Sequence, residues 1–397
     1  MATTEDTAAE VFTTLVAPIE EAATMTVASA RSSRRRALDI VVRSVLPIVL
    51  ALVVAGLILL ALGKNPMAFY AAVFDNGVVG LNWQHSLVMM TPLLLIAIGL
   101  IVVFRGQLWN LGYNGQYLLG AVAVAGFGPQ LVATTSPGVA YLVLTLAAIA
   151  VGAAWTLLPA WLKARFGTNE IITTLVMSTI GIGVTNILIV YVFQDPDVRT
   201  PQTRSMDLSV LLPYIPGTQV HIGFIVAIIF AITFQFILSR TSFGLRLDVF
   251  GSSPKAARHV GIDSRRMTVV LFLISGGLIG LAAAMDIFGQ FGYIRTNWNP
   301  AYGDTIMPFV FLARLSPVGS IPFIAFYSIF ATGGTIAAQE TGLSVDFLKV
   351  IVALILVFMT ITEYVGTKRD LGQSYLPDEL KDAVRRPLAA LTGRVSP

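Results

Sequence analysis

The sequence predicts an all-α, polytopic membrane protein with about ten transmembrane helices, and three observations support this fold class. Of its 397 residues, 55% are hydrophobic and only 12% are charged, whereas soluble domains carry about 25% charged residues. The mean hydropathy is +0.78. The apolar residues gather in runs of about 20, the length a helix needs to cross a bilayer. A soluble fold would need a polar surface that this composition lacks.

Each apolar run along the sequence is a predicted transmembrane span. Two of them are candidates for broken or re-entrant spans, because the third contains Asn110, Asn114 and Gln116 and the eighth is short. Non-helical backbone at membrane depth is tolerated only where protein or water covers it. The ten predicted spans are Val41–Leu62, Leu87–Phe104, Leu108–Leu131, Ala140–Leu162, Ile171–Phe193, His221–Leu238, Met267–Phe288, Pro300–Leu312, Pro317–Ala337 and Phe347–Tyr364.

The basic residues predict the orientation. With the amino terminus inside, 21 of the 26 lysines and arginines fall on inside segments, and only Lys64, Arg199, Arg204, Arg295 and Lys349 fall outside. Positive residues stay on the cytoplasmic side of a membrane. We therefore expect a cytoplasmic N-terminal tail (1–40), a transmembrane domain (41–365) and a cytoplasmic C-terminal tail (366–397). The first 30 residues lack the basic start and apolar core of a signal peptide.

Several classes of chemistry are excluded. The chain has no cysteine and three scattered histidines, His85, His221 and His259, so disulfides, thiolate sites and a histidine metal site are not expected. We see no cluster of His, Asp or Glu that would make an enzyme, and no phosphate-binding loop. The net charge of +4 comes from residues that flank apolar runs, which indicates membrane orientation rather than nucleic-acid binding. We expect no bound cofactor and no nucleic acid.

The inside loop Thr241–Arg266 is basic and long enough for a pair of short helices. Ser253 and Pro254 are typical of an N-cap and a first helical position. Ala256, Ala257, Val260 and Gly261 then fall on adjacent turns, so the predicted helix has a small, smooth face that Lys255, Arg258 and Arg265 surround. This helix could dock into a soluble subunit. The alternative is an ordinary basic loop held by lipid phosphates.

Five blocks of sequence carry a resemblance to a known family. GSSPKAARHVG (Gly251–Gly261) resembles the coupling loop of ABC importer permeases, in particular of the family that carries nucleosides and simple sugars. The other blocks are similar to conserved blocks of that family in the same order: WNLGYNGQYLLGA (Trp109–Ala121), GTNEIITTLVMSTIG (Gly167–Gly181), SGGLIGLAAA (Ser275–Ala284), and LARLSPVGSIP (Leu312–Pro322) with QETGLS (Gln339–Ser344). The resemblance covers about Val41 to Val365. It departs from the family at Asn114, Ser178 and Ser252–Ser253.

This resemblance implies a function and partners. The chain would be the permease subunit of an ABC importer in a bacterial inner membrane. It would pair with a second permease that is a different chain, and a cytoplasmic ABC ATPase would hold the ATP. An extracytoplasmic solute-binding protein would deliver nucleosides or simple sugars, between which the sequence does not choose. The alternative, an ion-coupled secondary transporter, would need coupling acids in mid-span.

Polar residues inside the spans are the candidate substrate path. Asn110, Asn114 and Gln116 would line it, with Asp286 and Gln290 nearer the outer mouth. An ionisable group in a span is a functional hypothesis by default. The alternatives are hydrogen bonding between helices for the amides and interfacial solvation for Asp286.

Asn169 and Glu170 open the fifth predicted span. Asn169 suits an N-cap, and an acid in the first turn interacts favourably with the helix dipole. The alternative to this structural role is one in gating or docking.

Overall fold

The computed structural model describes residues 41–207 and 211–370. The two predicted tails therefore lie outside the described residues, except for the last turn of the final helix. The structure is 77% helical, and the described residues contain isolated β-bridges but no strand. The predicted all-α class is confirmed.

The described residues include nine helices long and apolar enough to cross a membrane, and these match nine of the ten predicted spans. Two of them are interrupted: α5 (Pro137–Trp155) continues as α6 (Leu157–Phe166), and α11 (Ser264–Asp286) continues as the π-helix η2 (Ile287–Phe291). The other seven are Val41–Ala61, α3 (Asn82–Arg105), α4 (Tyr113–Thr134), α7 (Glu170–Tyr191), α8 (Gly223–Arg240), α13 (Pro317–Glu340) and α14 (Phe347–Asp370).

The eighth predicted span contains a helix that is too short to cross a bilayer by itself. Its helix, α12 (Tyr302–Leu312), has 11 residues and is about 16 Å long at 1.5 Å per residue. Phe311 stacks on Phe104, near the end of α3, with ring centroids 5.1 Å apart. Ser316 then donates to Gln235 near the end of α8 at 2.9 Å. The eighth predicted span therefore contains an 11-residue helix that follows the non-helical segment 292–301.

The end of the bundle that α12 reaches is named here the basic end. It carries the helix ends at Arg105 and Arg240, the last turn of α6 with Lys163 and Arg165, and the first turn of α11. The loop between α8 and α11 lies there as well. It forms α9 (Ser242–Ser252) and α10 (Pro254–His259), which is the predicted pair of short helices.

The chain divides into two compact units. The smaller contains the described residues 41–53 and 354–370, and in it the Arg43 guanidinium lies against Gly366. The larger, Val54–Ala353, contains every site discussed below.

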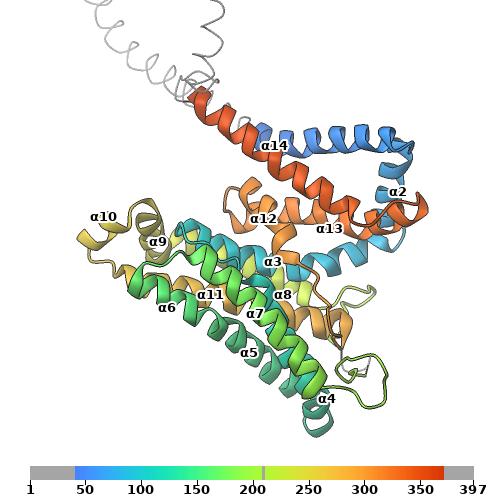
Figure 1. The fold of residues 1–397 in the computed structure, drawn as a ribbon, viewed down its shortest axis with the longest axis horizontal. Coiled ribbons are helices and arrows are strands. Elements are labelled where there is room, and N and C mark those ends of the chain that lie inside the picture. Colours follow the sequence, from blue (N-terminus) through green and yellow to red (C-terminus); the bar gives the residue numbers. More distant parts are fainter. Residues whose placement is uncertain (1–40, 208–210, 371–397) are drawn as a thin grey trace, which may run out of the picture. The chain divides into compact units, whose positions relative to one another are not determined.

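Glycines set the packing of the larger unit, whose α3 and α11 are its most deeply buried spans. Figure 1 shows α11 beside α5 and α3. A Cβ on Gly152 of α5 would overlap the backbone oxygen of Gly276 on α11, and one on Gly280 would overlap that of Ala148. The small residues between Ser275 and Gly280 therefore permit tight helix packing.

One helix of the larger unit is absent from the prediction. α2 (Pro66–Val78) is capped by Asn65, whose side chain accepts from Met67 N at 2.9 Å, and Pro66 occupies its first turn. It packs on α13, where a Cβ on Gly333 would overlap the Val73 backbone oxygen. The Asn-Pro pair at 65–66 is a helix-start signal of the kind that identified α10.

Candidate functional site

A non-helical segment precedes α4, as the sequence predicted for the third span. It is called the first break below. Residues 106–112 are non-helical, and Gln107 has a φ of 55°. The Asn110 Nδ2 donates to Gln116 Oε1 at 3.0 Å and to Ser275 Oγ at 2.9 Å, and Asn110 Oδ1 accepts from Gln116 Nε2 at 2.8 Å. Both amides are buried, with at most 1% exposure. They hold the broken backbone against α11, so their predicted part in the substrate path stays a prediction.

A second break precedes α12, and the two broken helices meet. The Tyr113 hydroxyl donates to Asp304 Oδ1 at 2.6 Å, and Asn114 Nδ2 donates to Asp304 Oδ2 at 3.0 Å. A Cβ on Gly303 would overlap the Tyr113 ring, so glycine is needed for this close approach. The start of α4 and the start of α12 therefore form one polar junction inside the bundle.

Asp286 forms a separate, buried part of the same region. Its carboxylate accepts from the Tyr117 and Tyr302 hydroxyls. The Tyr117 ring lies edge-on to Tyr302 at 5.5 Å and 6.1 Å from Trp298. Asp286 is 2% exposed, so the predicted alternative of solvation at the membrane surface does not describe its surroundings. A carboxylate buried without partners would cost several kcal/mol, and the two hydroxyls reduce that cost.

The predicted path residues are thus brought together in part. Asn110 pairs with Gln116, and Asn114 contacts the junction through Asp304. Gln290 is exposed in η2 and makes no hydrogen bond with any of them among the described residues.

Sequence reasoning missed Asp304. The rule that selected Asp286, an ionisable residue inside a predicted span, selects Asp304 as well, because it lies within Pro300–Leu312. Asp304 is therefore an acid inside a predicted span, in addition to Asp286.

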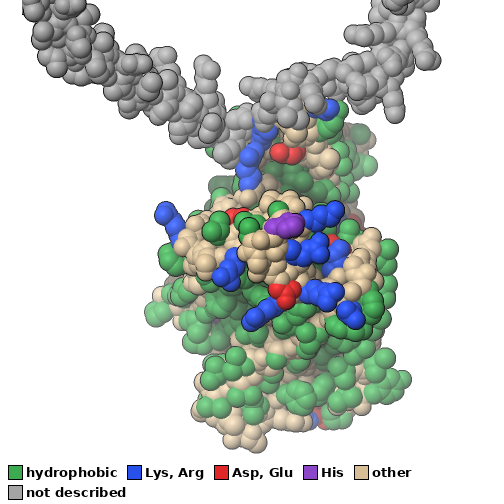
Figure 2. Space-filling model, turned by 90° about the vertical axis from the view of Figure 1, so that its left-hand side faces the viewer, with side chains coloured by type: hydrophobic (Ala, Val, Ile, Leu, Met, Phe, Trp, Pro, Cys, Tyr) green, Lys and Arg blue, Asp and Glu red, His purple; other side chains and the backbone are tan. Residues whose placement is uncertain are grey.

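The other candidate surface is the basic end. Figure 2 shows Lys and Arg side chains gathered on the face that carries α9 and α10, with hydrophobic side chains over the rest. The basic residues of α9, α10 and the α11 start are Arg246, Lys255, Arg258, Arg265 and Arg266.

Helix α10 begins and ends as predicted. Ser253 Oγ accepts from Ala256 N at 3.2 Å, Pro254 is the first helical residue, and Gly261 follows the helix with a φ of 79°. Ala257 is fully buried, whereas Ala256, Arg258 and Val260 are exposed. The face available to a partner is therefore carried by Ala256 and Val260, and Ala257 packs within the chain.

Two hollows flank α10. One of about 450 Å³ is lined by α9 and the α11 start, including Arg246, Val260 and Arg266. The other, of about 630 Å³, includes Lys163, Pro254 and Arg258. A short ridge between two basic hollows is a shape that a soluble partner with an acidic rim would fit.

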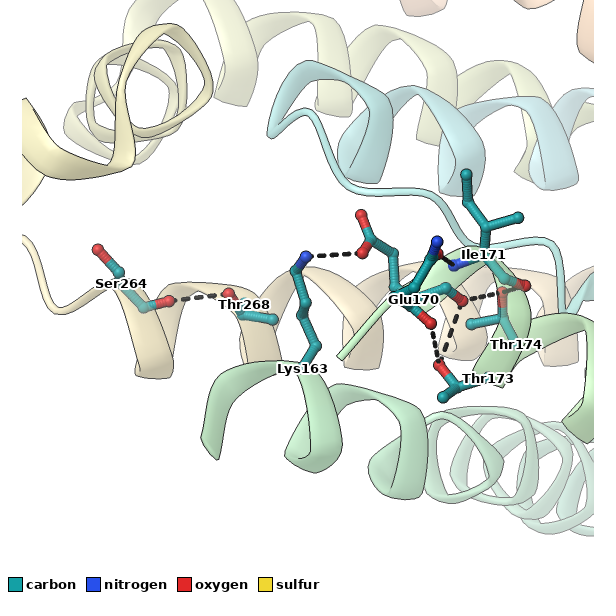
Figure 3. Close-up of polar contacts among 8 residues, drawn as sticks. Lys163, Glu170, Ile171, Thr173, Thr174, Ser264 and Thr268 are labelled. Carbon is teal, nitrogen blue, oxygen red and sulfur yellow. Dashed lines mark hydrogen bonds and ion pairs between the residues drawn. The ribbon is translucent and has the colours of Figure 1, made fainter. Parts of the chain in front are cut away.

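Ion pairs and hydrogen bonds tie the basic end to the first break. Lys163 of α6 lies 2.7 Å from Glu170 at the start of α7 (Figure 3). Asn169 Oδ1 accepts from Ile171 N at 2.9 Å, which confirms the predicted N-cap. Thr174 Oγ1 donates to the Glu170 backbone oxygen and accepts from Leu111 N at 3.1 Å. The start of α7 therefore supports the broken segment directly, and a gating role for Glu170 stays a prediction.

A second connection joins α9 to α3. Arg105 donates to both carboxylate oxygens of Asp248, at 2.7 and 2.9 Å. A Cβ on Gly251 would overlap the Arg105 backbone oxygen. The loop helix is thus fixed to the residue that precedes the break.

These features define a class: a polytopic helical membrane protein with a polar junction of broken helices and a basic end that carries two short loop helices. The family described as "Branched-chain amino acid transport system / permease component" matches residues 82–360, and the chain belongs to this family. The matched range includes both breaks and the loop helices.

Relatives with assigned names agree with the class. The chain is 30% identical to the glucose ABC transporter permease protein TsgB13 of Haloferax volcanii over 81% of this chain and 87% of that protein. It is 29% identical to the guanosine ABC transporter permease protein NupP of Bacillus subtilis, over 79% and 90%. It is 25% identical to the nucleoside ABC transporter permease protein NupB of Lactococcus lactis, over 79% and 89%. No solved structure matches the chain. The chain is an ABC transporter permease, as the resemblance implied.

Proposed function

We propose that this permease forms the translocation path of an ATP-driven importer for nucleosides or simple sugars. The observation that carries the proposal is the polar junction of α4 and α12, because non-helical backbone at membrane depth is tolerated only where protein covers it or where it lines a water-filled cavity. The relatives named for glucose, guanosine and nucleosides support solutes that are neutral and rich in hydroxyls.

The proposal assigns ATP hydrolysis to a separate ABC ATPase that docks on α10. Closure of the ATPases would move α10 and α9. The Arg105–Asp248 pair would carry this movement to the first break, and the Lys163–Glu170 pair would carry movement of α6 to the start of α7. The junction would then open to one side of the membrane or the other, and no bond in the solute would be broken.

The remaining partners and the orientation belong to the same proposal. The two Bacillus subtilis relatives named for guanosine, NupP and NupQ, support a second, different permease. We place the basic end and both termini on the cytoplasmic side of a bacterial inner membrane, following the charge distribution. An external solute-binding protein would deliver the solute from the other side.

The test is uptake in proteoliposomes that contain this permease with its ATPase and its second permease. Uptake of labelled adenosine or glucose should require internal-face ATP and the binding protein, and it should survive a protonophore. Uptake that needs no ATP and follows a proton gradient would instead support the ion-coupled alternative.

A further inference from the structure

We infer that Asp304 is a solute-binding residue whose carboxylate accepts hydrogen bonds from two neighbouring hydroxyls of the transported solute. The inference rests on the proposed function and names the atoms that would meet the solute. Three observations carry it: the depth of Asp304, its exposure, and the pattern of hydrogen bonds it already makes.

Two helices give the same depth. Asp304 lies eight residues before the end of α12 at Leu312, next to the basic end. The second helix is α7, which begins at the basic end with Glu170. Its Ser178 lies eight residues further along, and Ser178 Oγ accepts from Gly115 N, next to Asn114 of the junction. At 1.5 Å per residue both counts place the junction about 12 Å inside the bundle. The hydrocarbon core is about 30 Å thick, so Asp304 lies within it.

Asp304 is nevertheless exposed in the chain, and Asn114 is half-buried. An ionisable side chain at this depth faces a bundle interior or a water-filled cavity rather than lipid. The side chain is held in place by Tyr113 and Asn114 rather than pointing freely outward. The exposed side of Asp304 therefore faces a water-filled path.

The hydrogen bonds that Asp304 already makes leave both of its carboxylate oxygens able to accept one more. Each carboxylate oxygen can accept about two hydrogen bonds, and each already accepts one, from Tyr113 on Oδ1 and from Asn114 on Oδ2. One acceptor position remains on each oxygen. Two adjacent acceptors match a pair of hydroxyls on neighbouring carbons, which ribose and simple sugars both carry.

An aromatic side chain lies close to the junction. Trp298 is half-buried in the segment before α12, and its ring contacts Tyr117 and Phe291 at 6.1 and 4.9 Å. Because the ring is only half-buried, its exposed part could contact the apolar face of a sugar ring or a base. The ligand class is therefore a neutral solute that combines a vicinal hydroxyl pair with a flat apolar face.

The first experiment tests water access, and it uses the absence of cysteine from the chain. Asp304→Cys is compared with Ile232→Cys in the assembled transporter, each treated with trimethylammonium-ethyl methanethiosulfonate. Ile232 lies eight residues before the end of α8 and is exposed, so it matches Asp304 in depth. Asp304→Cys should react at least about tenfold faster. Equal rates, or no reaction at Asp304→Cys because a second permease covers it, would overturn the inference.

The second experiment tests the ligand, with Thr305→Cys as the reporter beside the site. Adenosine or glucose should slow its modification several-fold, and 2′,3′-dideoxyadenosine, which lacks the vicinal pair of ribose hydroxyls, should protect less than adenosine. Asp304→Ala in the same background should remove the protection. Equal protection by dideoxyadenosine, protection that survives Asp304→Ala, or no protection by either solute contradicts the diol assignment. If the labelling results are as expected but the unmodified transporter shows no ATP-dependent uptake, the proposed function is contradicted and the inference about Asp304 is not.

Discussion

At the scale of single residues, the structure separates side chains that hold the fold from those that remain available to a solute. Asn110 and Gln116 satisfy each other, Ser275 and the backbone of Gly112. Asn114 and Asp304 share one hydrogen bond and keep exposed surface. The sequence gives all three amides the same polar-in-apolar pattern, and it cannot separate them because the difference depends on which partner each meets across the bundle.

This distinction predicts opposite effects for two alanine variants. Asn110→Ala leaves the buried Gln116 amide and the Gly112 N–H without a partner, so it should lower stability by about 1–3 kcal/mol and reduce the amount of folded protein. Asn114→Ala is the matched control, and it should change stability less but weaken uptake per folded molecule at limiting solute. Thermal unfolding of the purified transporter and uptake per folded complex measure the two effects. Equal stability of the two variants would contradict the structural role of Asn110.

His221 predicts a pH dependence of stability. It is fully buried before α8, beside Gly223 and Gly289, and neither ring nitrogen has a hydrogen-bond partner among the described residues. Burial lowers its pKa to about 4 from an ordinary 6.5. Between these values the unfolded state binds a proton that the folded state does not, so stability falls as the pH falls from about 6.5 towards 4, by up to about 3 kcal/mol.

The variant His221→Leu should remove this part of the pH dependence, and His85→Leu, at an exposed position, should leave it unchanged. Unfolding measured at several pH values in that window tests the claim. An identical loss of stability in wild type and His221→Leu would show that other groups are responsible.

At the scale of elements, the local signals in the sequence proved sufficient where the physics is local. The N-caps at Ser253 and Asn169, the proline at the start of α10 and the apolar runs are read correctly, because each depends on neighbouring residues. α2 was missed although Asn65 and Pro66 carry the same kind of signal. The short α12 was indicated by its short apolar run, whereas its contact with α4 depends on packing between distant segments and no local pattern specifies it.

The exposed face of α10 predicts where the ATPase binds. Val260 is a large apolar side chain, 68% exposed on a basic surface, and a buried interface would lose affinity if a charge replaced it. Val260→Asp should therefore reduce co-purification of the ATPase at least about tenfold while membrane insertion stays normal. Leu245→Asp, also 68% exposed but on α9, is the control and should reduce it less. Retention of the ATPase by Val260→Asp would contradict docking on α10 and favour a lipid-bound loop.

At the scale of the whole molecule, composition and charge predict ten crossings. The described residues contain nine helices long enough to cross a membrane, and the remaining predicted span has only an 11-residue helix. The cytoplasmic location of the two tails remains a prediction because the tails lie outside the described residues. Composition alone does not indicate that the segments before α4 and α12 are non-helical or that these two helices meet. That arrangement depends on how α3, α4, α11 and α12 pack against one another.

The orientation predicts a pattern of labelling in intact cells. Ser252→Cys in the loop of the basic end should resist an impermeant maleimide, and Thr203→Cys in the connector before α8 should react. Ser33→Cys and Ser374→Cys, in the two tails, should resist as well. Reaction of Ser252→Cys before the cells are broken would reverse the proposed sidedness.

The central claim is that nucleotide at the basic end controls access to the junction of α4 and α12. The most direct measurement is the modification rate of Asp304→Cys, with reagent on one side of the membrane, in nucleotide-free transporter and in transporter trapped with ATP and vanadate. The rates should differ at least about fivefold. Arg105→Asp should abolish the difference, and adding Asp248→Arg should restore it. A rate that does not respond to nucleotide in the otherwise unmodified transporter would contradict the account.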